Sequence, residues 1–178
     1  GDSRIGWVEA YEAFLDLACS REFDHTRSVY VYVDLSRVRK AGERLKGFGG
    51  TSNPVKLPDL FPKMADILNG AYGRQLSSVE VCLLIDEAAA VVVAGNIRRS
   101  AGMRQFNSYD EEAARAKDSL WQQDAEGNWS IDPKRDALRM ANHTRVFHTQ
   151  PSYPTVLDSV RKQFDSGEGA IQYAPEAI

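Results

Sequence analysis

The sequence has few cysteines and no long apolar run, and these absences exclude several classes of protein. Cys19 and Cys82, its two cysteines, lie far apart and outside any CxxC or Cys/His cluster, so neither a disulfide scaffold nor a zinc site is expected. The longest apolar run, Ala88–Ala94, is too short to cross a bilayer. No basic start leads into an apolar signal segment. We therefore expect a cytoplasmic protein without a membrane partner.

A strong charge of one sign is also missing. The 178 residues carry a formal net charge of −3, which disfavours a nucleic-acid partner, because proteins that bind nucleic acids are normally basic. Neither a GxxxxGK[ST] phosphate loop nor a GxSxG nucleophile motif occurs. His143 and His148 are spaced for neither a strand face nor a helix face, so no metal site is expected. The 43% of hydrophobic residues nevertheless suffices for a folded core.

The two ends of the chain resemble cuts through a larger protein. The chain starts with Gly1 rather than Met and enters a capped amphipathic helix almost at once. The last ten residues, 169–178, stop without a polar tail. We therefore expect residues 1–178 to be a single, undivided fragment.

The order of predicted elements favours an α/β fold with parallel strand pairing, because strands alternate with helices. Residues 28–33 are β-branched and aromatic throughout, which predicts a buried strand. Further strands are expected at 101–106 and 145–148. Helices are expected from Ser3 to Ala18, and at 60–68, 77–92, 110–120, 133–142 and 154–164, with a polar turn region at 122–132.

A long polar segment, residues 34–58, contains the first pattern that indicates chemistry. Five basic residues fall within Arg37–Lys46, and three glycines follow them. Arginine and lysine bring charge and hydrogen-bond donors to phosphate oxygens, and glycines let backbone N–H groups approach closely. The pattern suits a triphosphate. A solvated basic loop whose glycines only turn the chain explains the same composition.

Two shorter segments are also candidates, each with a structural alternative. Arg98 and Arg99 follow Gly95 between a predicted buried helix and a strand, where they suit a base edge or a phosphate but equally a helix C-terminus. Asp2 precedes a helix, where it suits a ribose hydroxyl but equally an N-cap. Cys19 and Cys82 lie in apolar helical patterns, which predicts unreactive core thiols.

Several strings together resemble one family. The opening Gly-Asp-Ser, Leu45–Thr51 (LKGFGGT) and Val93–Ala101 (VAGNIRRSA) occur in the same order in adenosylcobalamin-dependent, or class II, ribonucleotide reductases. Arg139–His148 and Gly167–Glu176 are similar to the cyanobacterial type of that enzyme. The resemblance covers nearly the whole chain.

The resemblance implies a fold and a set of site residues. The chain would be a slice of a ten-stranded α/β barrel that carries the allosteric specificity loops, at about 34–58 and 95–101. Asp2 and Ser3 would hold the deoxyribose of an effector dNTP, and Arg37, Arg39 and Lys46 would lie near its phosphates. The loop that reads the effector base would carry Gly95, Asn96, Arg98 and Arg99.

The resemblance also implies the activity of a parent enzyme. That enzyme would reduce ribonucleotides, as triphosphates or alternatively as diphosphates, by radical chemistry started by adenosylcobalamin, with a thioredoxin-type reductant. Its radical cysteine and redox cysteine pair would lie outside these residues, so the fragment alone would be inactive, would not bind the cofactor and would have no catalytic residue. A stand-alone dNTP-binding regulatory module, or a structural slice without binding activity, remains an alternative.

Overall fold

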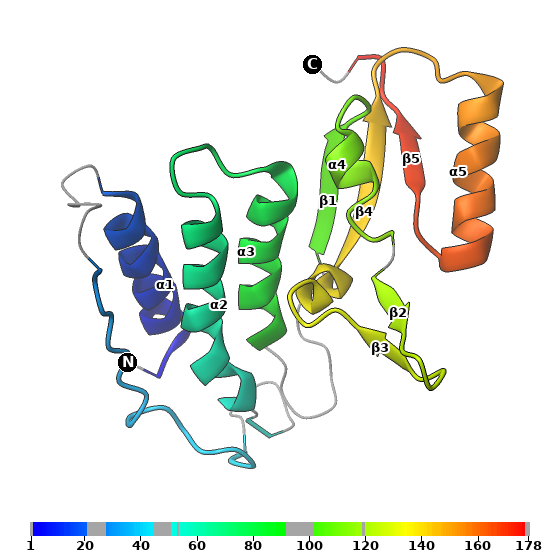
Figure 1. Ribbon diagram of the computed structural model, residues 1–178. Coiled ribbons are helices and arrows are strands. Elements are labelled where there is room, and N and C mark those ends of the chain that lie inside the picture. The colour runs from blue at the N-terminus through cyan, green and yellow to red at the C-terminus, as the bar shows by residue number, and fades with distance from the viewer. Residues whose placement is uncertain are drawn as a thin grey trace. The chain divides into compact units, whose positions relative to one another are not determined.

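A computed structural model describes residues 2–20, 28–44, 51–52, 54–91, 102–118 and 120–176 (Figure 1). Its contacts divide the chain into two compact units. The first comprises Gly1–Gln75 with Ala90–Arg99, and the second comprises Leu76–Ala89 with Ser100–Ile178. Each unit is described by itself below.

The first unit is built on two helices, α1 (Arg4–Cys19) and α2 (Leu57–Gly70), with a 3-10 turn at Pro54–Lys56 before α2. The two helices meet where the rings of Phe14 and Phe61 lie 5.5 Å apart. Apolar residues recur every three or four positions along α2, so their side chains share one side of the helix. The buried residues of α2 are Leu57, Leu60, Phe61 and Met64. The helices predicted at 3–18 and 60–68 are confirmed.

Residues 28–33 are the largest error of the sequence prediction. They form no strand, and Tyr30 and Tyr32 are 93% and 90% exposed. A β-rich sequence needs partner strands to supply hydrogen bonds and cover its faces. Within the described residues, this segment has neither.

The polar segment that follows is more ordered than its composition suggests. Gly42 has a positive φ of 89°, and its N–H donates to the carbonyl of Ser52 over 2.9 Å. The N–H of Ser52 donates to the carbonyl of Glu43 over 2.8 Å, and Arg44 bridges to Thr51. The chain therefore folds back on itself here, with glycine at the turn because the left-handed conformation favours it.

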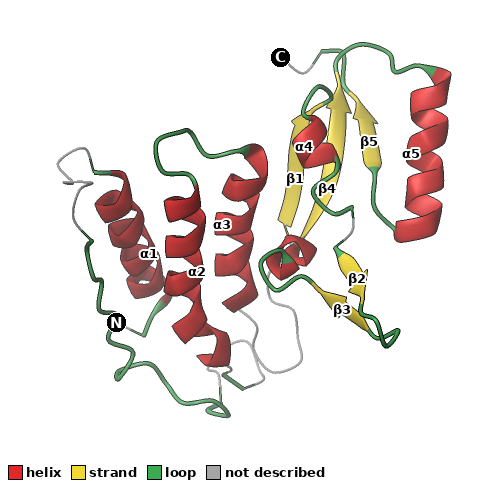
Figure 2. Ribbon diagram, viewed as in Figure 1, coloured by secondary structure: helices red, strands yellow, loops and turns green. Residues whose placement is uncertain are grey.

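The second unit contains a three-stranded sheet. Its strands are β1 (Gly102–Asn107), β4 (Ala141–Phe147) and β5 (Ala170–Tyr173). They pair in parallel in the order β1-β4-β5 (Figure 2). The α/β class with parallel pairing is therefore confirmed. Around the sheet lie α3 (Ser78–Val91), α4 (Glu111–Ala114) and α5 (Tyr153–Ser166).

Several boundaries in this unit differ from the predictions. The helix expected at 133–142 is only a 3-10 turn, Asp136–Met140, and β4 begins at Ala141 rather than at 145. Helix α4 is much shorter than the predicted 110–120. The predicted turn region contains a hairpin of β2 (Trp121–Gln123) and β3 (Trp129–Ile131), and β5 was not predicted at all. These short elements depend on pairing with distant residues rather than on local pattern.

One face of the sheet lies under α4 and α5. In β4, the side chains of Ala141, His143 and Phe147 are buried, whereas Asn142 is exposed, as the two-residue repeat of a strand requires. His143 and Phe147 line a groove of about 850 Å³ together with residues of α4 and α5.

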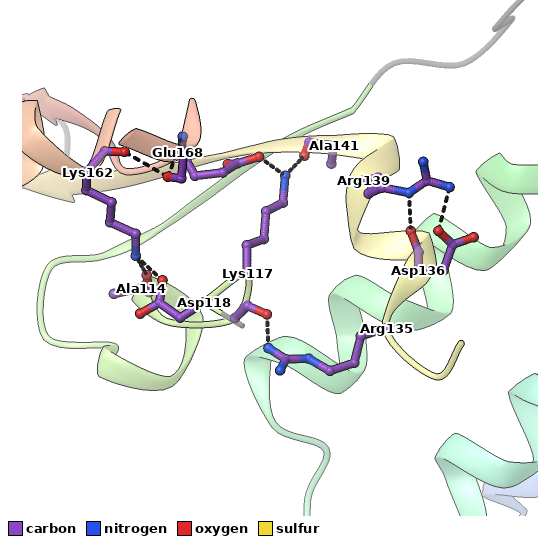
Figure 3. Close-up of polar contacts among 11 residues, drawn as sticks. Ala114, Lys117, Asp118, Arg135, Asp136, Arg139, Ala141, Lys162 and Glu168 are labelled. Atoms are coloured by element: carbon purple, nitrogen blue, oxygen red, sulfur yellow. Dashed lines mark hydrogen bonds and ion pairs between the residues drawn. The ribbon is translucent and has the colours of Figure 1, made fainter. Parts of the chain in front are cut away.

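Two lysines hold this groove together (Figure 3). Lys117 donates to Glu168 over 2.8 Å and to the carbonyl of Ala141. Lys162, on α5, donates to the carbonyl of Ala114 over 3.0 Å and pairs with Asp118. Both lysines therefore tie the turn after α4 to the other wall of the groove.

The two thiols differ in their surroundings. Cys19 is exposed at the end of α1, so its prediction as a core thiol is wrong. Cys82 is half-buried on α3, and burial, followed by the charge of Asp86, raises its pKa above the ordinary value. A raised pKa disfavours the reactive thiolate. Across the described ranges, no helix has both the length and the apolar character needed to span a membrane.

Candidate functional site

Asp2 and Arg39 lie together in the first unit, although 37 residues separate them in the chain. The Nε of Arg39 donates to Oδ2 of Asp2 over 2.6 Å, and the backbone N–H of Arg39 donates to the same oxygen over 3.0 Å. The Nη2 of Arg39 approaches the carbonyl of Asp2 at 3.4 Å. The start of α1 is thereby joined to the basic segment.

This contact stabilises the charged forms of both residues. Burial alone would raise the pKa of the Asp2 carboxyl, but the hydrogen bonds and the positive charge of Arg39 hold it below its ordinary value. The hydrogen bond to Asp2 raises the pKa of Arg39 in turn. Asp2 is mostly buried, whereas Arg39 remains partly exposed. The site therefore offers an ionised carboxylate beside a guanidinium that solvent and ligands can reach.

Ser3 caps α1. Its backbone is extended, with φ −148° and ψ 162°, and its Oγ accepts a hydrogen bond from the N–H of Gly6 over 3.0 Å. This geometry satisfies one of the free N–H groups at a helix start. Ser3 thus places Asp2 directly before the positive end of the helix dipole, where a carboxylate is stabilised.

We expect Ser3→Ala to lower the free energy of unfolding by about 1 kcal/mol, because the capping hydrogen bond is lost. Ser3→Asp retains an acceptor and serves as the matched control. Urea unfolding followed by circular dichroism measures both variants. Unfolding curves of Ser3→Ala that superimpose on the wild-type curves would show that the cap contributes nothing.

Of the other site residues predicted from the sequence, the structure describes only Arg37. Arg37 is exposed on the turn closed by the hydrogen bond from the N–H of Val38 to the carbonyl of Leu35. The structure thus brings Asp2, Ser3 and Arg39 together, with Arg37 on the same segment as Arg39. The other predicted site residues lie outside the described residues: Lys46, Gly95, Asn96, Arg98 and Arg99.

A buried ion pair between α3 and β1 was missed from the sequence. Asp86, on α3, is fully buried and pairs with Arg104 on β1. The signal was present, because Asp86 and Glu87 interrupt the apolar run that follows the first turn of α3, and a buried carboxylate needs a partner. Only the fold shows that the partner is Arg104.

The groove over β4 contains the one strongly shifted histidine of the described residues. Burial, and then the charge of Lys117, lowers the pKa of His143 to about 4. Its ring lies 6.2 Å from the ring of Phe106 in an edge-on arrangement. His143 is therefore neutral near pH 7. The Nδ1 of His148 contacts the carbonyl of Ala174 at 3.0 Å. No set of three potential metal ligands gathers anywhere in the part of the chain that the structure describes.

Comparisons with known proteins place these observations in a family. Residues 1–68 match the family model of the B12-dependent ribonucleotide reductase insertion domain. That region contains Asp2, Ser3 and the whole of the basic segment. Residues 1–68, which make up most of the first unit, are therefore similar to the insertion domain of such a reductase.

Curated relatives extend the similarity beyond this region. The chain is 31% identical over 120 residues to an adenosylcobalamin-dependent ribonucleoside-triphosphate reductase of Lactobacillus acidophilus, covering 65% of the chain and 16% of the relative. The enzyme of the same name from Lactobacillus delbrueckii subsp. bulgaricus is 36% identical over 115 residues, 62% of the chain and 15% of the relative. A probable enzyme of this kind from Dictyostelium discoideum is 30% identical over 149 residues, 82% of the chain and 17% of the relative.

The chain is thus related to the B12-dependent ribonucleotide reductases, as the motifs predicted. It spans about one sixth of the length of the curated relatives described above. No solved structure shows significant similarity to it.

Proposed function

We propose that this chain is part of an adenosylcobalamin-dependent ribonucleotide reductase and carries its dNTP effector region. The parent enzyme converts ribonucleotides to deoxyribonucleotides, and its substrates are triphosphates, as the names of the relatives say of those proteins. The observation that carries the proposal is the contact between Asp2 and Arg39. It joins two motifs that the family resemblance assigned separately to the sugar and the phosphates of one effector.

In this proposal, different residues bind the sugar and the phosphates of the effector. The carboxylate of Asp2 accepts a hydrogen bond from the deoxyribose hydroxyl, as acidic residues do in dinucleotide sites, and Ser3 lies beside it. The cations Arg37, Arg39 and Lys46 neutralise the phosphate oxygens, for which the forked donors of arginine are well suited. A single guanidinium at Arg39 therefore serves two purposes, because it orients Asp2 and faces the phosphates.

The base of the effector is read by the second loop. Gly95, Asn96, Arg98 and Arg99 belong to it in this proposal, and its shape passes the identity of the effector to the substrate site. The coupling is bounded by the difference in affinity of each effector for the alternative loop shapes.

The chemistry itself belongs to other parts of the parent. When bound there, adenosylcobalamin supplies the radical that starts the reduction, and a thioredoxin-type reductant restores the enzyme. The groove over β4 does not fit this cofactor, because the ion pairs of Lys117 and Lys162 occupy it. Cys19 and Cys82 have no catalytic role in this proposal, and the catalytic cysteines lie outside residues 1–178. The location is cytoplasmic.

The sheet of the second unit fits this assignment as part of the family's α/β barrel. Parallel strands connected through helices, as in β1-β4-β5, are the repeating unit of such barrels. Both edge strands, β1 and β5, offer backbone groups for further strands of the parent.

Calorimetric titration of the four dNTPs into the full-length protein tests the proposal. We expect saturable binding of at least one dNTP and a change in the preferred ribonucleotide when the dNTP is changed. The absence of both in the full-length protein with adenosylcobalamin present would contradict it. The gene sequence on either side of residues 1–178 distinguishes a reductase from a stand-alone binding module. Cysteine-containing coding sequence on both sides supports the reductase.

We expect Arg98→Ala in the full-length protein to reduce the effector-dependent change in substrate preference by about fivefold, at the lower end of typical allosteric couplings. Effector binding is partly retained, because the sugar and phosphate contacts lie elsewhere. Competition assays with mixed ribonucleotides under each effector measure the preference. An unchanged preference pattern would contradict the role of this arginine.

A further inference from the structure

The turn that follows Arg39 in the first unit has a well-defined shape. In residues 40–43, the N–H of Glu43 approaches the carbonyl of Lys40 at 3.4 Å, and the N–H of Lys40 donates to Oε1 of Glu43 over 2.9 Å. Gly42 is the third residue of this turn, and its φ of 89° suits a type II turn, which requires a positive φ at that place. The direction of the chain after Arg39 is therefore fixed locally.

Ser52 attaches this turn to a later part of the same segment. Its Oγ donates to the carbonyl of Lys40, its N–H donates to the carbonyl of Glu43 over 2.8 Å, and its carbonyl accepts from the N–H of Gly42 over 2.9 Å. Ser52 is 7% exposed, so these hydrogen bonds are shielded from water and are stronger for it. Both backbone groups of Lys40, its N–H and its carbonyl, thus have partners.

Arg39, the residue before this turn, is engaged by Asp2. The backbone N–H and the Nε of Arg39 both donate to Oδ2 of Asp2, and its Nη2 approaches the carbonyl of Asp2 at 3.4 Å. The positive charge of Arg39 is therefore largely balanced by the carboxylate. A triphosphate carries several negative charges, so it needs further cations whose charge is not already balanced.

Lys40 supplies such a charge next to this pair. Its side chain is exposed, and its Nζ forms no ion pair with any residue that the structure describes. Its Cα lies about 3.8 Å from that of Arg39, the usual spacing of consecutive residues. Because Glu43 and Ser52 already hold the backbone of Lys40, less conformational freedom is lost when its ammonium group binds an anion.

We propose that Lys40 is a phosphate-binding residue of the effector site, and that Ser52 is a positioning residue that holds the backbone of Lys40 in place. The inference rests on the proposed function, in which a dNTP binds along Asp2 and the basic segment. Arg39 is attached to the residue that holds the sugar, so it binds the α-phosphate. Lys40, one residue further from Asp2, binds the β- and γ-phosphates and gives the site a preference for triphosphates over monophosphates.

The test uses the full-length protein and two probes, the dNTP that wild type binds most tightly and the corresponding dNMP. Isothermal titration gives both dissociation constants, and their ratio is the triphosphate preference. The melting temperature without ligand reports on stability. The variants are Lys40→Gln, Lys40→Arg and Ser52→Ala. Lys56→Gln is the matched control, because Lys56 is an exposed lysine on the 3-10 turn of the same unit.

We expect Lys40→Gln to weaken dNTP binding by about tenfold and to leave dNMP binding within about twofold of wild type, because only a charged contact to the outer phosphates is lost. Lys40→Arg retains the triphosphate preference, since it keeps the charge. Ser52→Ala lowers the preference by about threefold, but it lowers it no further when combined with Lys40→Gln, because both changes act on one contact. Lys56→Gln leaves both dissociation constants unchanged.

Three results overturn the inference while wild type still binds dNTPs. They are an unchanged triphosphate preference in Lys40→Gln, an equal weakening of dNTP and dNMP binding in that variant, and the same loss of preference in Lys56→Gln. If Ser52→Ala does not fold, the two variants of Lys40 decide the question, because an exposed side chain can be replaced without disturbing the core. A wild-type protein that binds no dNTP contradicts the proposed function itself, and the inference fails with it.

Discussion

Replacement of Asp2 by alanine in the full-length protein is expected to weaken dNTP effector binding by about 10- to 100-fold. The estimate corresponds to the loss of a hydrogen bond to a charged group, which contributes about 1.5–3 kcal/mol. Two losses combine here, because the deoxyribose hydroxyl loses its acceptor and Arg39 loses the carboxylate that orients its guanidinium. Isothermal titration with each dNTP measures the change.

Two further variants separate the effector role from a structural one. Asp16→Ala removes an exposed carboxylate from α1, the helix that Asp2 precedes, and should leave dNTP affinity unchanged. Arg39→Ala should weaken binding as well, and its effect combined with Asp2→Ala should be less than additive, because the two residues are in contact. Wild-type affinity in Asp2→Ala, together with lowered stability, would make the Asp2–Arg39 contact purely structural.

Acidification is expected to destabilise the second unit through His143. Its pKa is about 4 in the folded protein, against about 6.5 for an unperturbed histidine. As the pH falls below about 6.5, the unfolded chain takes up a proton that the folded chain does not, so unfolding becomes more favourable. Well above pH 6.5 the histidine does not lower the free energy of unfolding. The destabilisation begins near pH 6.5 and grows until the pH reaches about 4. The contribution is about 2 kcal/mol at about pH 5 and reaches about 3 kcal/mol below pH 4.

Urea unfolding at about pH 7 and about pH 5 tests this expectation by comparing each variant with wild type. His143→Gln removes the titrating group, so its unfolding free energy should fall less between the two pH values than that of wild type. His148→Gln, at an exposed histidine just beyond the end of β4, is the control for the substitution itself. Equal pH dependence in wild type and His143→Gln would contradict the assigned pKa.

The helices were predicted better than the strands, for a physical reason. The apolar periodicity of α2 and the Gly167 end of α5 are local signals, and the structure has helices at both places. A strand is stabilised by residues elsewhere in the chain. Hence residues 28–33 were predicted as a strand and are exposed, whereas β5 was missed and pairs with β4.

In the candidate site too, the residues could be named from local motifs, whereas their contacts depend on distant parts of the chain. Asp2, Ser3 and Arg39 were each named from motifs, with a structural alternative for Asp2 and for the basic segment. The N-cap alternative for Asp2 is wrong, because Ser3 is the residue that caps α1, whereas Asp2 binds Arg39. For the Asp86–Arg104 pair, the sequence offered only a carboxylate on an apolar helix. Its partner was not readable, because Arg104 lies on a separate element.

The sequence by itself predicted the similarity to the reductases, most of the longer helices and a set of candidate residues for a nucleotide, because motifs and helical periodicity are local properties of the chain. The tertiary structure decided which of those residues meet. It joined Asp2 to Arg39 and Asp86 to Arg104, and it buried His143 beneath the ion pairs of the groove. Ionisation and positioning depend on burial and on charges from distant segments, and both arise only when the chain folds.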